Sequence, residues 1–410
     1  MNKGLIVLLA CVFSVMIGLG ITLPVLPFYV ERLALAAGTS RQGLAVQVGL
    51  LTGVYALGQF FFAPVWGRLS DRVGRRPLVV IGIGGYVVSQ VLFGLANSIE
   101  LLYVARVLGG ILSSAVLPVA AAYVSDVTTE RARARGMAWL GAAVSLGFVV
   151  GPALGGLLAR RDLHFAGQLG HLRLDGFSVP FFTAALIALV SLLAALRWLP
   201  ESLPKQTTTD PSEVENGENS WLVIQRLGAL LGLTFAGQFA LALYEGIFAL
   251  HAQSVLKFGL TEIGAVFVVC GLVMSVFQVG AVGWLDGRIS ELQRVGTGFA
   301  VVAVSLGLMA LARTPALVFG LAALIALGIA LISPNVSSLI SRRAGGRVGT
   351  ALGIQNAANS LGQASGPLVG GLLFAWRIDA PYLLTAALLL VIATVIGWRV
   401  RTSHIALVTS

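Results

Sequence analysis

The sequence predicts an all-α polytopic membrane protein with twelve transmembrane helices in two pseudo-symmetric six-helix halves. Of its 410 residues, 57% are hydrophobic and only 11% are charged, and the mean hydropathy is +0.92. A soluble chain of this length needs far more charge to cover its surface. Apolar runs long enough to cross a bilayer recur from end to end, and a glycine–proline pattern occurs twice.

The apolar runs predict six spans on each side of one polar segment. They lie at 4–30, 44–66, 78–97, 101–124, 136–158 and 178–198, and then at 222–250, 258–284, 296–313, 315–338, 350–375 and 380–400. The segment 199–221 is rich in Ser, Thr, Asn, Pro and acidic residues, which predicts a flexible cytoplasmic linker. We therefore expect an N-terminal half at 1–198, a C-terminal half at 222–400 and a tail at 401–410.

The basic residues are distributed unevenly between the two sets of loops. Most of the 27 Lys and Arg residues fall on the same side as the N-terminus, among them Arg68, Arg72, Arg75 and Arg76. Because cytoplasmic loops carry an excess of Lys and Arg, both termini are predicted to be cytoplasmic. The net charge of +10 therefore reflects membrane topology, and we expect no nucleic-acid partner.

An internal repeat supports two related halves. The pattern G-x-x-x-G-P-x-x-G-G starts at Gly147 and again at Gly362, 215 residues later, and the same offset relates Asp71 to Asp286. Interior glycine costs a helix about 1 kcal/mol and proline about 3 kcal/mol, so these spans need a compensating role. Small residues let helices pack closely in lipid. The repeat predicts two parallel halves that meet at the 136–158 and 350–375 spans.

The stretch GRLSDRVGRRP at 67–77, between the second and third spans, combines charge with glycines at fixed positions, whereas a loop that only sets topology needs the charge alone. It resembles the signature loop of the major facilitator superfamily. GPALGG, LLYVARVLGGI, LPVLPFYV and LPES resemble further motifs of its twelve-helix drug:proton antiporters, a group similar to tetracycline and multidrug efflux proteins. The matching residues are Gly67, Asp71, Arg72, Gly74, Arg75 and Arg76 in the loop, and Gly147, Gly151, Pro152, Gly155 and Gly156 in the antiporter motif.

The resemblance implies a major facilitator fold in a bacterial plasma (inner) membrane, with a latch on the cytoplasmic side. Asp71 would face the start of the eleventh span near Gly349, where the helix dipole favours an anion. Arg75 or Arg76 would pair with Asp126, and this latch would hold when the cavity opens outward. Exposed ion pairs contribute roughly 0–1 kcal/mol each, which suits a contact that reverses in every cycle.

The sequence departs from the tetracycline exporters at two places. Gly109 stands where the family often has Gln in the 101–124 span. The acidic residues of those exporters are absent from the first and third spans, which read FSVMIG and YVVSQV at the relevant stretches. The departures argue against tetracycline itself and against that class's proton pathway.

Three ionisable residues in or near the spans, Glu245, Glu31 and Arg106, are the candidate proton-coupling groups. Glu245 lies in an apolar stretch, where desolvation favours the neutral carboxyl; it could couple to protons or form a structural hydrogen bond. Glu31 lies beside Arg32 and could equally form a surface ion pair. Arg106 costs about 2.5–3.5 kcal/mol at mid-helix, and we expect a cavity-side role with bonds to the first span, or else structural snorkelling.

Polar residues inside apolar spans predict the lining of a substrate cavity, because lipid cannot satisfy their hydrogen bonds. Gln355, Asn359 and Gln363 are four residues apart and therefore share one helix face. Some of the other polar residues will serve only to hold helices together. The candidate cavity residues are Tyr55, Gln59, Gln90, Gln238, Tyr244, Gln278, Gln355, Asn356 and Asn359.

The sequence contains no G-x-x-x-x-G-K-[ST] loop for ATP, and all four histidines, including His251, lie in or near predicted loops or tails. We expect no enzyme activity, no cofactor and no metal, and an ion gradient as the energy source. The hypothesis is a monomeric, proton-coupled antiporter that exports a small lipophilic or amphiphilic compound by alternating access. The alternatives are a proton symporter for a small metabolite, a lipid or lysolipid translocator, and a non-transporting receptor.

Overall fold

The computed structural model describes residues 3–36, 41–159, 167–169, 172–174, 176–202, 220–285, 289–344 and 348–408. The N-terminal half consists of α1 (Lys3–Ala36), α2 (Arg41–Val73), α3 (Arg75–Gly94), α4 (Ile99–Ser113), α5 (Val116–Val127), α6 (Glu130–Leu158) and α7 (Ser178–Trp198). Between α6 and α7 in the chain, β1 (Gly167–Leu169) and β2 (Leu172–Leu174) form an antiparallel hairpin in which Gly167 pairs with Leu174. Helices α4 and α5 together make the fourth predicted span.

The C-terminal half begins with α8 (Ser220–His251), which continues into a single π-helical turn, η2 (Ala252–Leu256). The turn ends at Lys257, whose φ of 59° is left-handed. The remaining helices are α9 (Leu260–Leu285), α10 (Glu291–Met309), α11 (Pro315–Arg343), α12 (Val348–Trp376) and α13 (Ala380–Val408). These helices correspond one to one with the last six predicted spans.

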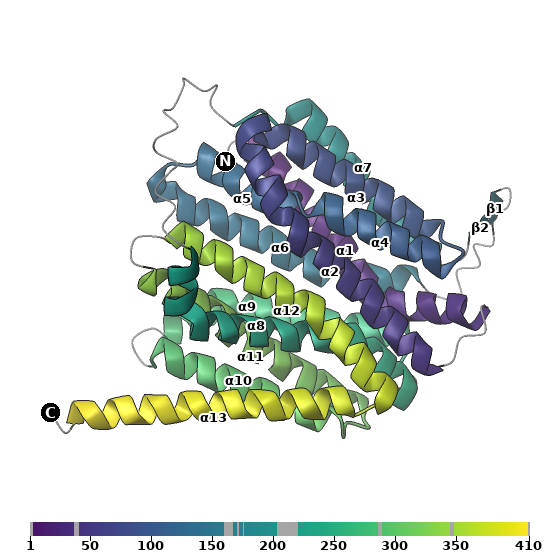
Figure 1. Cartoon of the computed structure of the whole chain (residues 1–410). Coiled ribbons are helices and arrows are strands. Elements are labelled where there is room, and N and C mark those ends of the chain that lie inside the picture. The colour runs from purple at the N-terminus through teal and green to yellow at the C-terminus, as the bar shows by residue number, and fades with distance from the viewer. Residues whose placement is uncertain are drawn as a thin grey trace.

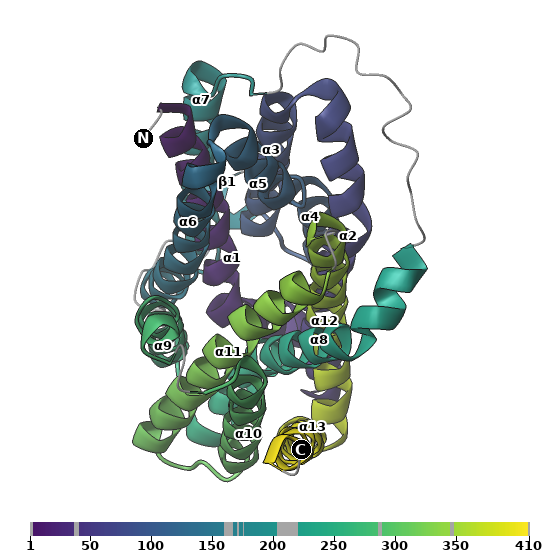
Figure 2. The same ribbon diagram turned by 90° about the vertical axis from the view of Figure 1, so that its left-hand side faces the viewer.

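The two halves repeat the same packing. In the N-terminal half, α1 packs against α6, and α3 packs against α7 and α4; the matching pairs in the C-terminal half are α8 with α12, α10 with α13, and α10 with α11. Between the halves, α2 packs against α12, and its counterpart α9 packs against α6. Figure 1 shows the N-terminal helices above the C-terminal ones, and Figure 2 shows the same two groups from one end. The predicted pseudo-symmetric fold is confirmed.

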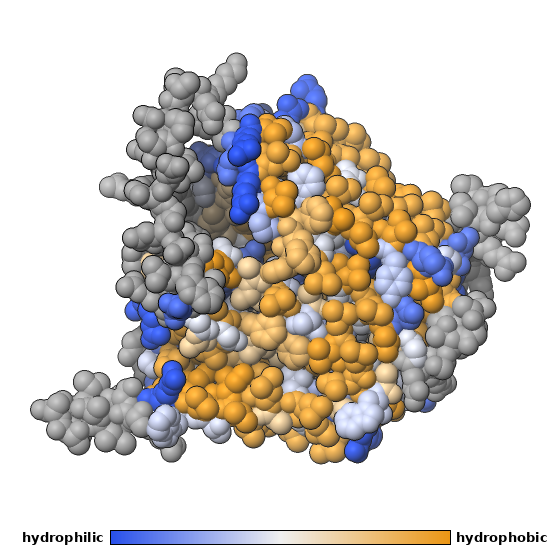
Figure 3. All heavy atoms as spheres, in the orientation of Figure 1, coloured by the Kyte–Doolittle hydropathy of each residue, from blue (hydrophilic) through white to orange (hydrophobic). Residues whose placement is uncertain are grey.

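The bundle has two ends, which we name by what lies there. The termini end holds Lys3, Val408 and the junction of α2 with α3, and the hairpin end holds β1 and β2 (Figure 1). Apolar residues cover the middle of the face in Figure 3, and hydrophilic residues gather towards both ends. Among the described residues, eleven helical segments are long and apolar enough to cross a membrane; the twelfth span, α12, carries the polar stripe. The chain is a multi-pass membrane protein.

Local signals set several helix ends. The Ser98 side chain accepts a hydrogen bond from the Leu101 backbone and caps α4. At the start of α10, Ser290 and Gln293 form a reciprocal capping box. Between α2 and α3 only Gly74 is non-helical, with a φ of 110° that favours glycine. These signals place the turns outside the apolar spans.

The structure corrects three expected boundaries. The predicted loop at 67–77 is helical through Val73 and again from Arg75, because no residue before Gly74 interrupts the helix. The 101–124 span breaks between α4 and α5, where the Ser113 and Ser114 hydroxyls bond back to main-chain carbonyls. Helix α13 continues through the expected tail to Val408. Most of the linker (203–219) and Asp286 lie outside the described residues.

Candidate transport site

A cavity of about 540 Å³ lies between the two halves. The N-terminal half contributes an apolar wall, mainly from α6, in which Ser145 is the one polar side chain among the described lining residues. The C-terminal half contributes nearly all of the polar lining, namely Gln238, Tyr244, Glu245, Cys270, Ser275 and Gln363. The cavity therefore has one greasy wall and one wall that can form hydrogen bonds, which suits an amphiphilic ligand.

Glu245 is the one charged residue among the described residues that line this cavity. Within the part of the chain that the structure describes, its carboxylate has no recorded hydrogen bond or ion pair, so the expected alternative of a structural hydrogen bond has no support there. No described basic side chain lines the cavity to neutralise it. An unpaired carboxylate in an apolar cavity is suited to binding either a proton or a cationic group of a ligand.

A smaller cavity of about 90 Å³ adjoins the first, because Gln238, Leu241 and Met274 line both. Gln355 and Asn359 line the small cavity, and Gln363 lines the large one. The polar stripe of α12 therefore faces both cavities, as its four-residue spacing predicts. Asn356 is exposed instead, and the side chain of Gln278 lies outside the described part of α9.

Two glycine contacts close the hairpin end. Gly156 of α6 meets Gly264 of α9, and a Cβ on Gly156 would lie 3.3 Å from the Gly264 Cα and 2.8 Å from the Leu260 carbonyl oxygen. Gly49 of α2 meets Gly371 of α12 in the same way, with the Gly371 Cβ position 3.3 Å from the Gly49 Cα. The 215-residue offset converts one contact into the other. The closure of this end is therefore itself pseudo-symmetric.

The antiporter motif divides its glycines between two neighbours. Gly147, Gly151 and Gly155 are four apart and pack against α1 of their own half, where a Cβ would overlap α1 backbone or side-chain atoms. Only Gly156, one residue further round the helix, and the Pro152 carbonyl reach α9 of the other half. The expectation that the whole motif forms the inter-half surface is therefore too broad.

A second contact links the halves at the hairpin end. The Gln253 amide of η2 donates a hydrogen bond to the Glu31 carboxylate of α1 over 2.5 Å. These two side chains also line a cavity of about 510 Å³, which is separate from the one that holds Glu245. Glu31 thus bonds across the inter-half boundary, so the expected pairing with Arg32 does not describe its recorded contact.

The large cavity lies on the termini side of these contacts. Its α6 wall runs from Pro152 to Met137, towards Glu130 where the helix begins. On α9 the lining residues run from Phe267 to Ser275, away from the contact at Gly264. The structure is therefore closed at the hairpin end, with the cavity directed towards the termini end.

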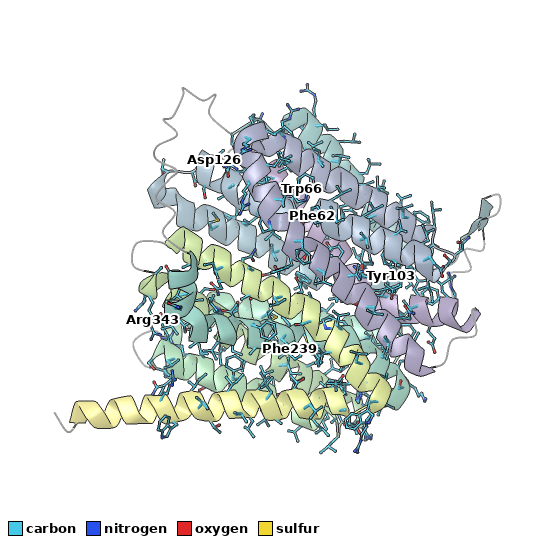
Figure 4. The ribbon with its side chains drawn as sticks, viewed as in Figure 1. Phe62, Trp66, Tyr103, Asp126, Phe239 and Arg343 are labelled. Atoms are coloured by element: carbon cyan, nitrogen blue, oxygen red, sulfur yellow. The ribbon has the colours of Figure 1, made fainter. Side chains whose placement is uncertain are left out.

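At the termini end, the Arg75 guanidinium joins two acidic side chains. It donates to Asp71 over 2.6 Å and to Asp126 over 3.0 Å, and Asp126 also accepts a bond from the Ser202 hydroxyl. Figure 4 shows Asp126 and, on the other half, Arg343 at this same end. All recorded partners of Asp71 and Asp126 among the described residues precede residue 203, so this network belongs to the N-terminal half.

The expected pairing of Arg75 with Asp126 is thus present, whereas the expected contact of Asp71 lies outside the described side chains, because Gly349 is not among them. Arg76 bonds to the Leu196 carbonyl, and Arg72 is exposed. Gly67 has no atom within 4 Å of its Cβ position.

Glu201, of the LPES stretch, ties the end of the N-terminal half to α3. Its carboxylate accepts hydrogen bonds from the backbone nitrogens of Arg75 over 2.8 Å and Arg76 over 3.1 Å. An anion at a helix N-terminus satisfies unpaired N–H groups and favours the helix dipole. A Cβ on Gly74 would lie 2.5 Å from this carboxylate, so the close approach requires glycine.

Arg106 is buried inside the N-terminal half rather than in the cavity lining. Its guanidinium carbon lies 5.2 Å from the ring centres of both Tyr55 and Phe93, and its Nε has no hydrogen-bond partner among the described residues. The expected bonds to α1 are therefore not found in the described part of the chain. The Tyr55 hydroxyl is 2.8 Å from Ser113 Oγ, and the amide of Gln59 donates to it over 3.4 Å.

Two groups of residues escape sequence reasoning. Met137, Leu140, Val144 and Phe148 form the apolar wall, but nothing distinguishes them in sequence from lipid-facing residues. Tyr55, Gln59 and Gln90 were expected in the cavity and are not among the described lining residues. Polar character identifies a buried position but does not say which side of a helix faces the ligand.

Comparison with known proteins gives consistent relatives over the full chain. Multidrug resistance proteins 2 and 1 of Bacillus subtilis (strain 168) are 28% and 29% identical, covering 94% and 97% of this chain and 92% and 97% of theirs. The quinolone resistance protein NorA of Staphylococcus aureus (strain MRSA252) is 26% identical, covering 93% of this chain and 92% of its own.

Solved transporters share the fold. A D-xylose–proton symporter superposes with a TM-score of 0.75 at 18% identity, covering 96% of both chains. A bacterial homolog of the human lysosomal transporter Spinster superposes with a TM-score of 0.73 at 16% identity, covering 96% of this chain and 95% of its own. The Major Facilitator Superfamily profile matches residues 8–345 and 230–407. The chain, with two pseudo-symmetric halves enclosing a cavity, belongs to the Major Facilitator Superfamily of membrane transporters.

Proposed function

We propose that this transporter exports small lipophilic or amphiphilic compounds in exchange for protons, by alternating access of one central cavity. The observation that carries the proposal is the cavity itself, in which a single carboxylate, Glu245, faces an apolar wall without a recorded partner among the described residues. Apolar surface accepts the body of a varied set of ligands, and the carboxylate supplies one site for which a proton and a ligand compete. The full-length multidrug and quinolone resistance relatives support export of such compounds.

Competition at Glu245 gives a simple exchange cycle. Substrate entering from the termini end favours the deprotonated carboxylate, and a proton arriving from the other side neutralises it and releases the substrate. Each ligand then shifts the balance between the two facing states by its differential affinity for them. We place the termini end in the cytoplasm because most Lys and Arg residues fall in the loops on that side. Since each chain encloses its own cavity, a monomer suffices.

Sugar symport is less well supported by the lining. A sugar needs several hydrogen-bonding side chains around it, yet the N-terminal half contributes only Ser145 to the polar lining among the described residues. The D-xylose symporter therefore shares the fold and carries no argument about substrate.

The test uses purified protein in liposomes with an acidic exterior, a trapped pH dye and ethidium, a quinolone and neutral lipophilic compounds as probes. We expect at least one probe to drive proton movement, and Glu245→Gln to abolish that movement. Glu262→Gln is the matched control, because Glu262 is exposed and bonds its own helix start at Gly259. If no probe moves protons, or if Glu245→Gln behaves as wild type, the proposal is wrong.

A further inference from the structure

A row of buried polar groups without partners crosses the C-terminal half behind Glu245. His251, expected near a loop, is instead completely buried at the last turn of α8, and neither ring nitrogen has a hydrogen-bond partner among the described residues. A buried histidine without partners is unfavourable, because each orphaned polar atom carries its full desolvation cost. Such a group needs a reason to be retained.

The neighbours of His251 lead towards the hairpin-end surface. Its ring packs edge-on against the ring of Tyr382 of α13, with the ring centres 4.8 Å apart, and the Tyr382 hydroxyl also has no partner within the described residues. Asp379, half-buried just before α13, and Arg313, exposed between α10 and α11, act electrostatically on His251. Asp379 therefore supplies a carboxylate that water can reach at one end of the row.

The row continues inward to the cavity. Tyr244 lies seven residues before His251, on the same face of α8, and its buried hydroxyl has no hydrogen-bond partner in the described part of the chain. The electrostatic neighbours of Tyr244 include Tyr382, Cys270 and Glu245. The Cys270 thiol lines the cavity with Glu245 and donates to the Ala322 carbonyl over 3.5 Å.

The aromatic packing holds these groups in place. The Tyr244 ring lies 5.1 Å from Phe248 and 6.4 Å from Phe267 between ring centres. His251 and Glu245 are six residues apart on α8, about 9 Å along the helix axis. Fixed groups of this spacing can be bridged by a few short proton transfers, directly or through bound water.

We propose that Asp379, His251, Tyr382, Tyr244 and Cys270 form a proton relay that connects water at the hairpin end with Glu245. The proposal rests on the proposed function, since it assigns a route to the proton that Glu245 exchanges. It differs from that function in placing the route through the core of the C-terminal half rather than through the substrate cavity.

The relay conserves atoms and charge. One proton from water binds the Asp379 carboxylate and passes to one nitrogen of neutral His251, which releases the proton on its other nitrogen. Each hydroxyl and the thiol then accept one proton on a lone pair and release the one they held. The net result is one proton transferred to the Glu245 carboxylate, with every intermediate group returned to its neutral form.

A route behind α8 resolves a steric conflict in the exchange cycle. A ligand that fills the cavity obstructs water from reaching Glu245 along the cavity, whereas the relay reaches the carboxylate from the other side of the helix. In the present state Tyr244, Tyr382 and His251 have no recorded hydrogen bonds to one another, so the relay is interrupted while the cavity faces the termini end. The interruption prevents protons from leaking through the protein without exchange.

The test compares Tyr382→Phe, Tyr244→Phe and His251→Gln with wild type in proteoliposomes, using ethidium as the probe. We expect ethidium-driven proton movement to slow by about tenfold or more in each variant. Ethidium binding and ethidium–ethidium exchange, which need no net proton transfer, should change less than twofold. Tyr86→Phe is the matched control, since Tyr86 is a buried tyrosine with an unpartnered hydroxyl in the other half.

The outcomes separate the relay from the proposed function. If Glu245→Gln abolishes proton movement while all three relay variants match Tyr86→Phe, the relay is overturned and the proposed function stands. If Glu245→Gln retains proton movement, the proposed function itself is wrong. Equal loss of ethidium binding and proton movement in the relay variants would indicate a structural role and would also overturn the relay.

Discussion

Gly156 and Gly264 bring the backbones of α6 and α9 into contact across the boundary between the halves, and Gly371 and Gly49 repeat this contact 215 residues away in sequence. Each glycine faces a backbone atom that cannot rotate away. The two contacts therefore act as a pair of stops that define how closely the hairpin end can close.

We expect Gly156→Val and Gly371→Val to shift the protein towards a state open at the hairpin end, because any Cβ would lie within 2.8 Å of the Leu260 oxygen or 2.5 Å of the Ala45 oxygen. Spin labels at Asn97→Cys and Thr314→Cys, in a background without native cysteines, report the distance across that end. The distance should lengthen in both variants. Gly353→Ala, at a position with no atom within 4 Å, should leave it unchanged.

The bond between Glu31 and Gln253 should make a weaker contribution to the same closure. Gln253→Leu removes a hydrogen bond to a charged group, worth about 1.5–3 kcal/mol when buried and less at this half-buried site. The labelled pair should show a larger open fraction than wild type. Ser254→Ala, which affects a hydroxyl bonded within its own helix, serves as the control, and equal distances in both variants would contradict the prediction.

The Arg75 network should stabilise the N-terminal half. Arg75→Gln leaves Asp71 and Asp126 without their shared cation at a site where Arg75 is only 8% exposed. We expect a loss of about 1–3 kcal/mol, seen as a lower melting temperature in detergent. Arg72→Gln, at an exposed position of the same motif, should melt as wild type does. An unchanged melting temperature for Arg75→Gln would show that the network contributes nothing.

Cys270 offers a native reporter of ligand binding. It lines the large cavity, whereas Cys11 is completely buried elsewhere. In a Cys11→Ser background, ethidium should slow maleimide modification of Cys270 severalfold, measured by intact mass. Labelling that proceeds at the same rate with saturating ethidium would mean that the probe does not occupy this cavity.

Some site residues follow from local sequence and others do not. Glu245 is identifiable because a carboxylate inside an apolar run is unfavourable unless it has a function, and the stripe of Gln355, Asn359 and Gln363 follows from helical spacing. Arg106 is equally conspicuous in sequence, yet its partners are the rings of Tyr55 and Phe93 on two other helices. Only the packing of α2, α3 and α4 decides that.

The sequence by itself determined the twelve spans, the two-half repeat and the presence of an intramembrane acid, because bilayer thickness and helical periodicity act on local composition. The tertiary structure alone decided that Gly156 touches Gly264 while Gly151 touches α1, that α6 forms the apolar wall, and that His251 is buried beside Tyr382. These facts depend on which helix faces which. Apolar residues that face lipid, a ligand or another helix look alike in a sequence.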